Sequence, residues 1–421
     1  MELKRIIHPI GQGAFYTEEL SYNGKYFNAV YDCGSITNKN ILKKRIDSYL
    51  DNLKKQQNKK VKPVIDIIFI SHFHDDHTNE IDYILTNADV QLLVLPQLNN
   101  GQILESFIYN YYSTKNIDNI SNNLLSILVN KQENYPYNDN NIRTKIIKEI
   151  SVVKEEQRNN SKDFIIVSFD EVEKKFTVSY SNVIPKDSND FLYIPYNLNI
   201  KEKTDKFIKF FIKKVKEFYD RDKNFQKELQ KKGIQKGNID NIVNNINLEL
   251  LKHIVESMGI SKCKHIYTEF FKNDHNSYSM PVFSGLNYKN SYRILSLINR
   301  KYCKCCFYGC IKNTSINNLN CLYTGDYEAE KNFDSLQKFY NNLNLWKTIK
   351  TIQVPHHCSR NNYHPDLYSN IFSCFISIGT TNTYGHPNID TLTNIQNKIC
   401  DVNIITENPL TEKIYNYLFK E

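Results

Sequence analysis

The stretch FISHFHDDH constrains this chain more than any other segment. It places His72, His74, Asp76 and His77 in the spacing H-x-H-x-D-H, directly after the apolar run VIDIIFI (64–70). A continuous run rich in β-branched residues predicts a strand that is buried on both faces. Alternate histidines leaving a strand can share one cation, and the Asp-His pair that follows can hold a second. Ligand sites collect at the carboxyl ends of strands in α/β sheets, so we predict a metal site here.

Chance is a poor explanation for this cluster. The chain of 421 residues contains only 11 histidines, and three of them fall within six positions. The formal net charge of +8 is modest for this length. It permits an anionic partner such as nucleic acid without requiring one.

Apolar, strand-like segments recur at both ends of the chain. The expected strands are LKRIIHPIGQG, KYFNAVYDCGS, VIDIIFI and VQLLVLP near the N-terminus, then SMPVF, NCLYTGD, TIKTIQVPHH, CFISIGT and VNIITE after residue 263. The first group alternates with the helical patterns NILKKRIDSYLDNLKKQQNKK and TNEIDYILTNA. This alternation predicts an α/β architecture.

The middle of the chain has a different character. Residues 100–262 are rich in Asn, Lys and Tyr and carry long amphipathic patterns, so we predict a large helical insertion between two halves of one α/β domain, 1–99 and 263–421. Residues 201–236 contain 13 basic and six acidic side chains. This excess is either a solvated helical face or a rim that attracts phosphate groups. We expect the insertion to cap the active-site face.

The H-x-H-x-D-H motif after an apolar strand resembles the signature of the metallo-β-lactamase fold superfamily. The resemblance implies an αβ/βα sandwich of two mixed sheets flanked by helices, with a dinuclear metal site. It implies that Asp32 in VYDCGS orients the site and that Asp326 in CLYTGDYE bridges two metals. It also implies that His275 in HNSYSMPVF and His386 in TTNTYGHP are metal ligands.

Further segments narrow the resemblance. QVPHHCS (353–359), SIGTTNTYGHPN (377–388) and the early GQGAFY resemble segments of ComEC-type metallo-β-lactamase domains, which are implicated in nucleic-acid degradation. The chain departs from that group at Cys358, where the group has Gly, and it lacks the ComEC membrane channel. The resemblance covers about residues 1–95 and 265–400 and leaves the insertion unmatched.

His356 and His357 allow two interpretations. Either histidine could hydrogen-bond a phosphoryl oxygen or protonate the leaving group. Alternatively, one replaces His275 as a metal ligand or supports the site from outside the ligand set. We favour His357 as the functional member, because it aligns with the histidine that precedes the small residue and Ser359.

These motifs together predict a hydrolase with two divalent metal ions, with zinc preferred and manganese or iron as alternatives. The metals would generate a hydroxide nucleophile near neutral pH, and Asp76 would orient it as well as bind metal. A phosphodiesterase or nuclease acting on nucleic acid or a nucleotide is the favoured function. The alternatives are a hydrolase of esters, thioesters, lactones or β-lactams, and an inactive binding module on the same fold.

Two expectations concern the chain as a whole. The N-terminus lacks the apolar core of a signal peptide and no stretch of 18 apolar residues occurs, so we expect a cytoplasmic protein without a membrane span. The cysteines fit reduced thiols. The segment CKCCFYGC (Cys303, Cys305, Cys306 and Cys310) is either a small zinc knuckle or a cysteine-rich loop.

Overall fold

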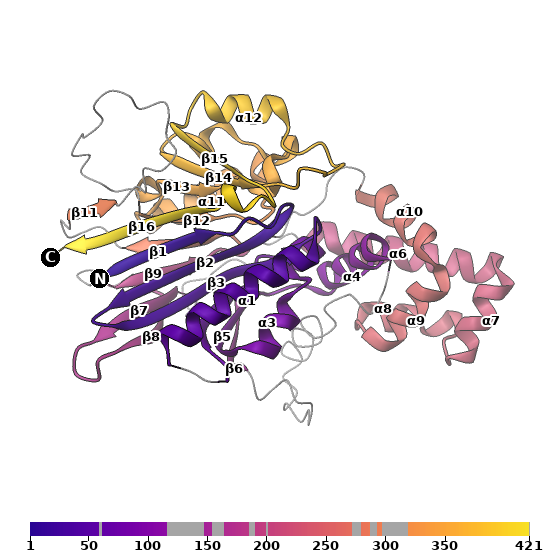
Figure 1. Cartoon of the computed structure of the whole chain (residues 1–421). Coiled ribbons are helices and arrows are strands. Elements are labelled where there is room, and N and C mark those ends of the chain that lie inside the picture. The colour runs from indigo at the N-terminus through magenta and orange to yellow at the C-terminus, as the bar shows by residue number, and fades with distance from the viewer. Residues whose placement is uncertain are drawn as a thin grey trace.

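The computed structural model describes residues 1–58, 61–115, 147–153, 164–184, 190–198, 201–271, 279–286, 293–296 and 319–420. These residues form a mixed α/β structure with two mixed sheets (Figure 1). Each sheet combines antiparallel strands at one side with parallel strands at the other. The parallel parts are β3-β4-β5-β6 in the first sheet and β12-β13-β14-β15 in the second.

The first sheet has the order β11 (Arg293–Ser296), β16 (Lys413–Lys420), β1 (Glu2–Ile7), β2 (Gly13–Tyr22), β3 (Lys25–Ser35), β4 (Val64–Phe69), β5 (Asp89–Pro96) and β6 (Ile147–Val153). The second has the order β15 (Asp401–Ile405), β14 (Ser373–Ser377), β13 (Thr351–Gln353), β12 (Cys321–Tyr323), β10 (Val282–Leu286), β9 (Phe191–Pro195), β7 (Phe164–Asp170) and β8 (Lys175–Ser181).

The described helices are α1 (Lys39–Gln56), α2 (Asp75–Thr78), α3 (Ile81–Asn87), α4 (Asn100–Thr114), α6 (Lys201–Arg221), α7 (Lys223–Lys231), α8 (Ile239–Asn244), α9 (Leu248–Met258), α10 (Ile260–Phe271), α11 (Ala329–Asn342) and α12 (Ile389–Gln396). Short 3₁₀ helices lie at η2 (Lys236–Asn238), η4 (Trp346–Thr348), η5 (Pro355–Cys358), η6 (Arg360–Asn362), η7 (Pro365–Tyr368) and η8 (Pro409–Thr411).

The two sheets share one apolar core, and helices cover their outer faces. Strand β4 shows how the sequence builds these layers. Ile67 and Phe69 point into the core between the sheets, whereas Ile65 and Ile68 point into the core beneath α1 and α3. The prediction that VIDIIFI is buried on both faces is therefore confirmed. A third core lies between the second sheet and helices α11 and α12.

Helix α1 shows why a charged segment forms a stable cover. The side chain of Asn38 caps its N-terminus by accepting hydrogen bonds from two backbone N–H groups. Its buried residues recur at helical spacing: Leu42, Ile46, Tyr49, Leu50 and Leu53. The helix therefore buries one apolar stripe on the sheet and leaves its charges to solvent.

A buried charged pair also joins the sheets. The guanidinium of Arg5 on β1 donates to the carboxylate of Glu18 on β2 at 2.5 Å, with both side chains almost fully buried. Strands of the second sheet complete the network, because Tyr193 on β9 and Tyr323 on β12 donate hydroxyl hydrogen bonds to Glu18 at 2.9 and 2.8 Å. Ser284 on β10 donates to the same carboxylate at 2.6 Å. The inter-sheet core thus contains a satisfied polar network as well as apolar contacts.

The expected helical insertion is only partly helical. Within 100–262, strand β6 joins the first sheet, and β7, β8 and β9 join the second. The apolar runs FIIVSFD and FLYIP supply buried strand residues, and our sequence analysis overlooked them because helical patterns surround them. Strand β2 was also missed. Helices α4 and α6 to α10 do pack together, and they form a lobe at one end of the sheets (Figure 1).

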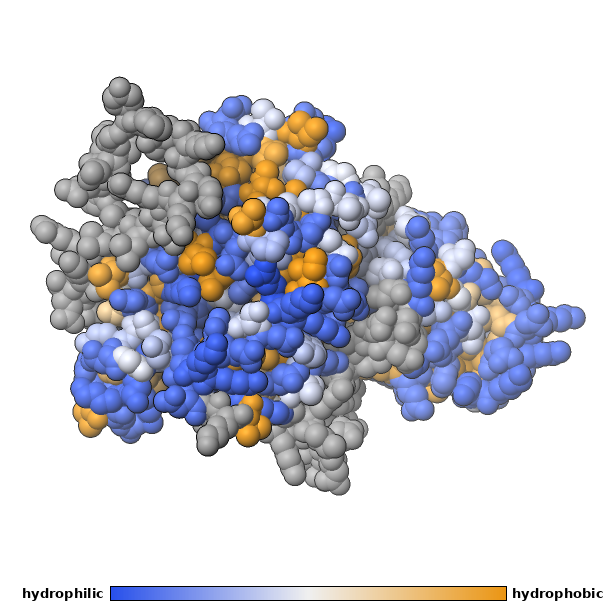
Figure 2. All heavy atoms as spheres, in the orientation of Figure 1, coloured by the Kyte–Doolittle hydropathy of each residue, from blue (hydrophilic) through white to orange (hydrophobic). Residues whose placement is uncertain are grey.

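Helix α6 turns one apolar face inward. Phe207, Ile208, Phe211 and Val215 of α6 are buried in the lobe, and Phe210 is partly buried. Hydrophilic residues cover the outer end of the lobe (Figure 2). Several of its lysines pair with acids of the same lobe, as Lys214 does with Glu269. Among the described residues, no helix is both long enough and apolar enough to cross a bilayer.

Candidate metal centre

The site forms where the parallel strands of both sheets end. His72, His74, Asp76 and His77 follow β4 in the first sheet. Asp326 follows β12 in the second sheet, and His356 and His357 follow β13 beside it. The carboxyl ends of parallel strands therefore bring together side chains that are about 250 residues apart in sequence, as in the 3.1 Å contact of His77 with Asp326.

Two groups of potential metal ligands share one carboxylate. The first group is His72, His74 and Asp326, and the second is Asp76, His77, Asp326 and His357. Within each group the ligand atoms lie within 4.8 Å of one another. All of these residues are buried except Asp76, which lies at the border of burial. These groups could hold metal ions, with Asp326 contacting both.

Asp32 and His77 are joined by a buried hydrogen bond. The Nδ1–H of His77 donates to Asp32 Oδ2 at 2.7 Å, and the backbone N–H of Ser71 donates to Asp32 Oδ1 at 2.7 Å. This leaves His77 Nε2 pointing at Asp326 Oδ1. A carboxylate that accepts from one imidazole nitrogen and leaves the other for a metal is the usual support of a histidine ligand.

His72 is held in the same way by serine hydroxyls. Ser71 Oγ donates to Asp32 Oδ2 at 2.6 Å, so it accepts from His72 Nδ1 at 2.9 Å. Ser279 Oγ lies 3.3 Å from the same nitrogen and accepts from the backbone N–H of Asp326 at 3.0 Å. His72 Nε2 then points at Asp326 Oδ2, at 3.5 Å, and has no hydrogen-bond partner among the described residues. A buried imidazole nitrogen left without a partner fits a metal ligand.

A tight turn presents His357 to the second group. His356, His357 and Cys358 have φ values of 47°, 53° and 68°, a left-handed run that is uncommon outside glycine. His357 Nδ1–H donates to the carbonyl of Ser377 at 2.6 Å, so its Nε2 faces Asp76 Oδ2 at 3.2 Å. His357 therefore lies among the side chains that could hold a metal ion.

His356 faces the same centre from its rim. Asn362 donates through Nδ2 to the carbonyls of Asp326 and Tyr327, which fixes its Oδ1 as the acceptor for His356 Nδ1–H at 3.0 Å. His356 Nε2 lies 3.6 Å from Asp326 Oδ2, and the side chain is 21% exposed. It is thus the histidine of this pair that solvent can reach.

The surroundings of Asp76 and Asp326 favour their ionised forms. Burial raises the pKa of Asp76, but His77 and the hydrogen bond from His357 outweigh burial and hold that pKa below its usual range. Burial likewise raises the pKa of Asp326, and the nearby His356, His77 and His72 bring it well below its usual range. Burial lowers the pKa of His77, yet Asp326, Asp76 and Asp32 together raise it. Buried ionised carboxylates that face imidazole nitrogens suit a cation.

Two predicted ligands have different outcomes. His386 is half-buried near the rim, with its ring centroid 5.3 Å from that of His356 and 6.5 Å from that of His357. It is not a member of either ligand group formed by the described residues, whereas His357 is a member of the second. His275 lies outside the described residues, as do the four cysteines of CKCCFYGC.

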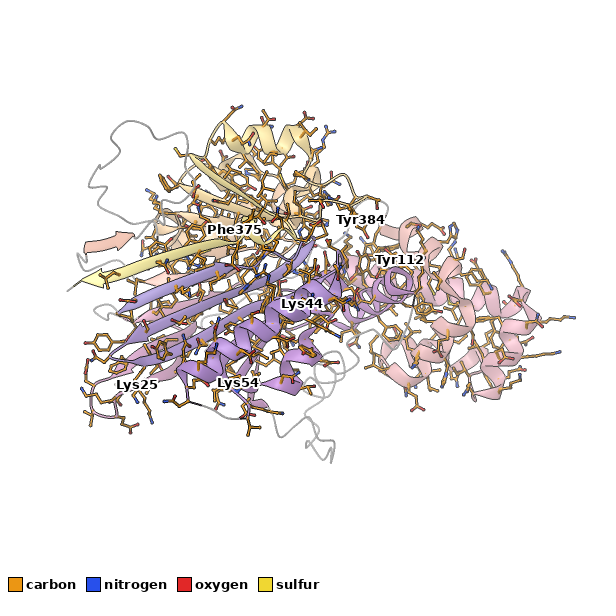
Figure 3. The ribbon with its side chains drawn as sticks, in the orientation of Figure 1. Lys25, Lys44, Lys54, Tyr112, Phe375 and Tyr384 are labelled. Atoms are coloured by element: carbon orange, nitrogen blue, oxygen red, sulfur yellow. The ribbon has the colours of Figure 1, made fainter. Side chains whose placement is uncertain are left out.

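Aromatic side chains from the lobe and from the β14–α12 segment adjoin the site. Tyr109 of α4 stacks on His74 with ring centroids 3.9 Å apart. Tyr112 of α4 and Tyr384 lie where the sheets meet the lobe (Figure 3). The ring of Tyr384 is 61% exposed and near-parallel to that of His386. Helix α4 is thus the part of the middle of the chain that adjoins the candidate site, and the expectation that residues 100–262 cap it stays a prediction.

Gly325, next to Asp326, has no room for a side chain. Its φ is +54°, and a Cβ there would lie 2.2 Å from Ser279 Oγ and 2.8 Å from Ser71 Oγ. Gly325→Ala should therefore cost more than the roughly 1–2 kcal/mol of a left-handed alanine and should displace the serines that hold His72. We expect an unfolding free energy lower by about 3 kcal/mol in urea titration, with about tenfold weaker metal binding.

Gly233 supplies the matched control for that substitution. It is also left-handed, with φ +73°, but a Cβ there meets nothing within 4 Å. Gly233→Ala should cost only about 1 kcal/mol and leave metal binding unchanged. Equal losses in the two variants would show that crowding at Gly325 is not important.

Sequence reasoning missed the supporting residues. Ser71 immediately precedes His72, and its place in the motif could have drawn attention to it. Asn362 and Ser377 carry no spacing signal, because their roles depend on how separate loops meet. Glu105 of α4, whose carboxylate lies 3.7 Å from His74 Nε2, was also missed.

No protein-family model matches the chain, and no curated protein matches it significantly. The two mixed sheets with flanking helices and the His/Asp cluster are compatible with a metallo-β-lactamase-like fold.

Proposed function

We propose that this protein is a metal-dependent hydrolase of the metallo-β-lactamase fold, with a dinuclear centre that cleaves phosphodiester bonds. The sharing of Asp326 between two buried ligand groups is the observation that carries the proposal. A carboxylate with one oxygen toward each group suits two ions held close together, the arrangement that clamps both the attacking and leaving oxygens in phosphoryl transfer. Metal ions held there would supply an activated water and would stabilise developing negative charge.

The chain's own residues would hold the two ions and keep the ligands oriented. His72 and His74 with Asp326 would hold one ion, and Asp76, His77 and His357 with Asp326 would hold the other. Asp32 and the two serines keep the imidazoles oriented, so little reorganisation is needed when substrate binds. Zinc suits this set of imidazole and carboxylate donors, and manganese or iron would also fit.

We assign to His356 the role of contacting the substrate. Its Nδ1–H is committed to Asn362, and its Nε2 lies beside Asp326 on the side that solvent reaches. When protonated, this nitrogen can donate to a phosphoryl oxygen or to the leaving oxygen. The neighbouring His386 and Tyr384 extend the same rim. A rim with histidine donors and an exposed aromatic ring suits a nucleotide, because a base can stack where the phosphate is held.

The resemblance to ComEC-type domains supports the same substrate class. The paired histidines and the Y-G-H-P segment carry that resemblance, and they supply His356, His357 and His386 at one side of the centre. Nucleic acid or a nucleotide is therefore the substrate class we propose.

The test combines metal content with hydrolysis. The purified protein should bind two divalent ions per chain by elemental analysis. It should cleave bis-p-nitrophenyl phosphate and labelled single-stranded DNA, and a chelator should abolish the cleavage. Cleavage of p-nitrophenyl acetate but neither phosphodiester would move the assignment to an ester hydrolase. Absence of bound metal under all loading conditions would overturn the proposal.

A further inference from the structure

Helix α4 of the lobe contacts the candidate metal centre at His74, and α10 packs on α4 behind it. Tyr109 stacks on the His74 ring at 3.9 Å between centroids, with an interplanar angle of 18°. Asn110 donates through Nδ2 to the carbonyl of Phe73 at 2.7 Å, which ties α4 to the backbone beside His74. The lobe therefore contributes part of the wall around the first ligand group.

Glu105 is the charged member of this wall. Its Oε1 lies 3.7 Å from His74 Nε2, and the two side chains are 2% and 0% exposed. The hydroxyl of Tyr267 on α10 donates a short hydrogen bond to the same carboxylate oxygen. A carboxylate buried this deeply is costly unless its partners are well placed, so its position beside an imidazole calls for a function.

The other histidines of the centre indicate what that function is. His72, His77 and His357 each use Nδ1 to hydrogen-bond a serine, a carboxylate or a carbonyl, and each turns Nε2 toward Asp76 or Asp326. For His74 the neighbouring carboxylate stands beside the opposite nitrogen, because Glu105 Oε1 lies 3.7 Å from Nε2, a distance longer than a hydrogen bond. A carboxylate beside Nε2 favours the proton on that nitrogen and leaves Nδ1 as the metal-binding atom.

We propose that Glu105 is a positioning residue of the metal centre, which accepts from His74 Nε2–H so that His74 binds the first ion through Nδ1. Tyr267 holds the carboxylate in place, and Tyr109 fixes the plane of the ring. The proposal rests on the proposed dinuclear function and extends it, because it makes the lobe a structural part of the centre as well as its border. A change in the packing of α10 on α4 would then alter metal affinity.

The test uses variants that separate positioning from direct ligation. Glu105→Ala removes the acceptor and should weaken binding of the ion at His72, His74 and Asp326 by about 10- to 100-fold. Glu105→Gln retains a carbonyl oxygen that can accept from Nε2–H, so it should remain within a few-fold of the wild type. Tyr267→Phe should give a smaller loss than Glu105→Ala. Glu249→Ala, at an exposed acid of α9 in the same lobe, is the control and should change nothing.

Metal titration with Co²⁺ and elemental analysis supply readouts that do not depend on activity. We expect Glu105→Ala to retain one ion under conditions in which the wild type holds two. In a His357→Ala background, which lacks a ligand of the other group, the same change should remove the remaining ion. Urea unfolding of the metal-free variants checks that each one folds.

The outcomes separate the two proposals. If the wild-type protein binds no metal, the proposed dinuclear function is itself overturned. A wild type with two ions and a Glu105→Ala variant that keeps both with unchanged affinity overturns only the role of Glu105. Equal losses in Glu105→Gln and Glu105→Ala also overturn it, because a positioning acceptor tolerates the amide whereas a direct carboxylate ligand does not.

Discussion

Asp326→Asn should lower kcat for bis-p-nitrophenyl phosphate by about a thousandfold or more, equivalent to about 4 kcal/mol of transition-state stabilisation. Asp326 belongs to both ligand groups, with Oδ1 near His77 and Oδ2 near His72. An asparagine keeps the shape of the side chain but removes the negative charge and offers only one oxygen. Both ions should therefore bind more weakly and no longer share a ligand.

The measurement pairs steady-state kinetics with metal content at saturating Zn²⁺ or Mn²⁺. Asp334→Asn is the matched control, because Asp334 is an exposed acid on α11 and belongs to neither ligand group formed by the described residues. The control should keep wild-type activity. An Asp326→Asn variant within tenfold of the wild type would contradict the shared-ligand assignment.

Glu18→Leu should lower the free energy of unfolding by about 3–5 kcal/mol. The substitution removes the partner of Arg5, whose side chain is fully buried between the sheets, and leaves its positive charge uncompensated. It also removes the acceptor for Tyr193 and Tyr323. Such a loss is a large fraction of the stability of an ordinary domain.

The double variant Arg5→Met/Glu18→Leu tests the reason for that loss. It leaves no buried charge, so it should be more stable than Glu18→Leu alone although it lacks more of the native network. Urea unfolding, followed by circular dichroism, measures both variants. A single variant that loses less than about 1 kcal/mol, or a double variant less stable than the single, would contradict this account.

Four of the candidate ligands could be predicted because they lie close together in the sequence. His72, His74, Asp76 and His77 lie within one turn after a buried strand, so their spacing and their position could both be inferred from the sequence. Asp326 could be inferred from the sequence for a similar reason, since it follows a short apolar strand. The position of His357 beside Asp76 could not be inferred from the sequence, because it depends on the left-handed turn at 356–358 and on the contact of His357 with Ser377.

The strands likewise divide into those that could be predicted from the sequence and those that could not. Strands β3, β4 and β5 were predicted almost to the residue, because continuous apolar runs with β-branched residues have few alternatives. Strands β6 to β9 were not predicted, because they lie in a region where helical patterns dominate and their partners are distant in sequence. Strand pairing over such separations depends on tertiary contacts that local propensity does not describe.

The division of ligands between the sheets has a consequence for folding. The histidines after β4 belong to one sheet, whereas Asp326 and His357 belong to the other. Ions bound by both sets would act as cross-links between the two sheets, and they would bind the folded chain in preference to the unfolded one. Each ion at a hundred times its Kd would add about 2.7 kcal/mol to the stability of the folded state. The same atoms that would perform the chemistry would thus also fasten the two halves of the protein to each other.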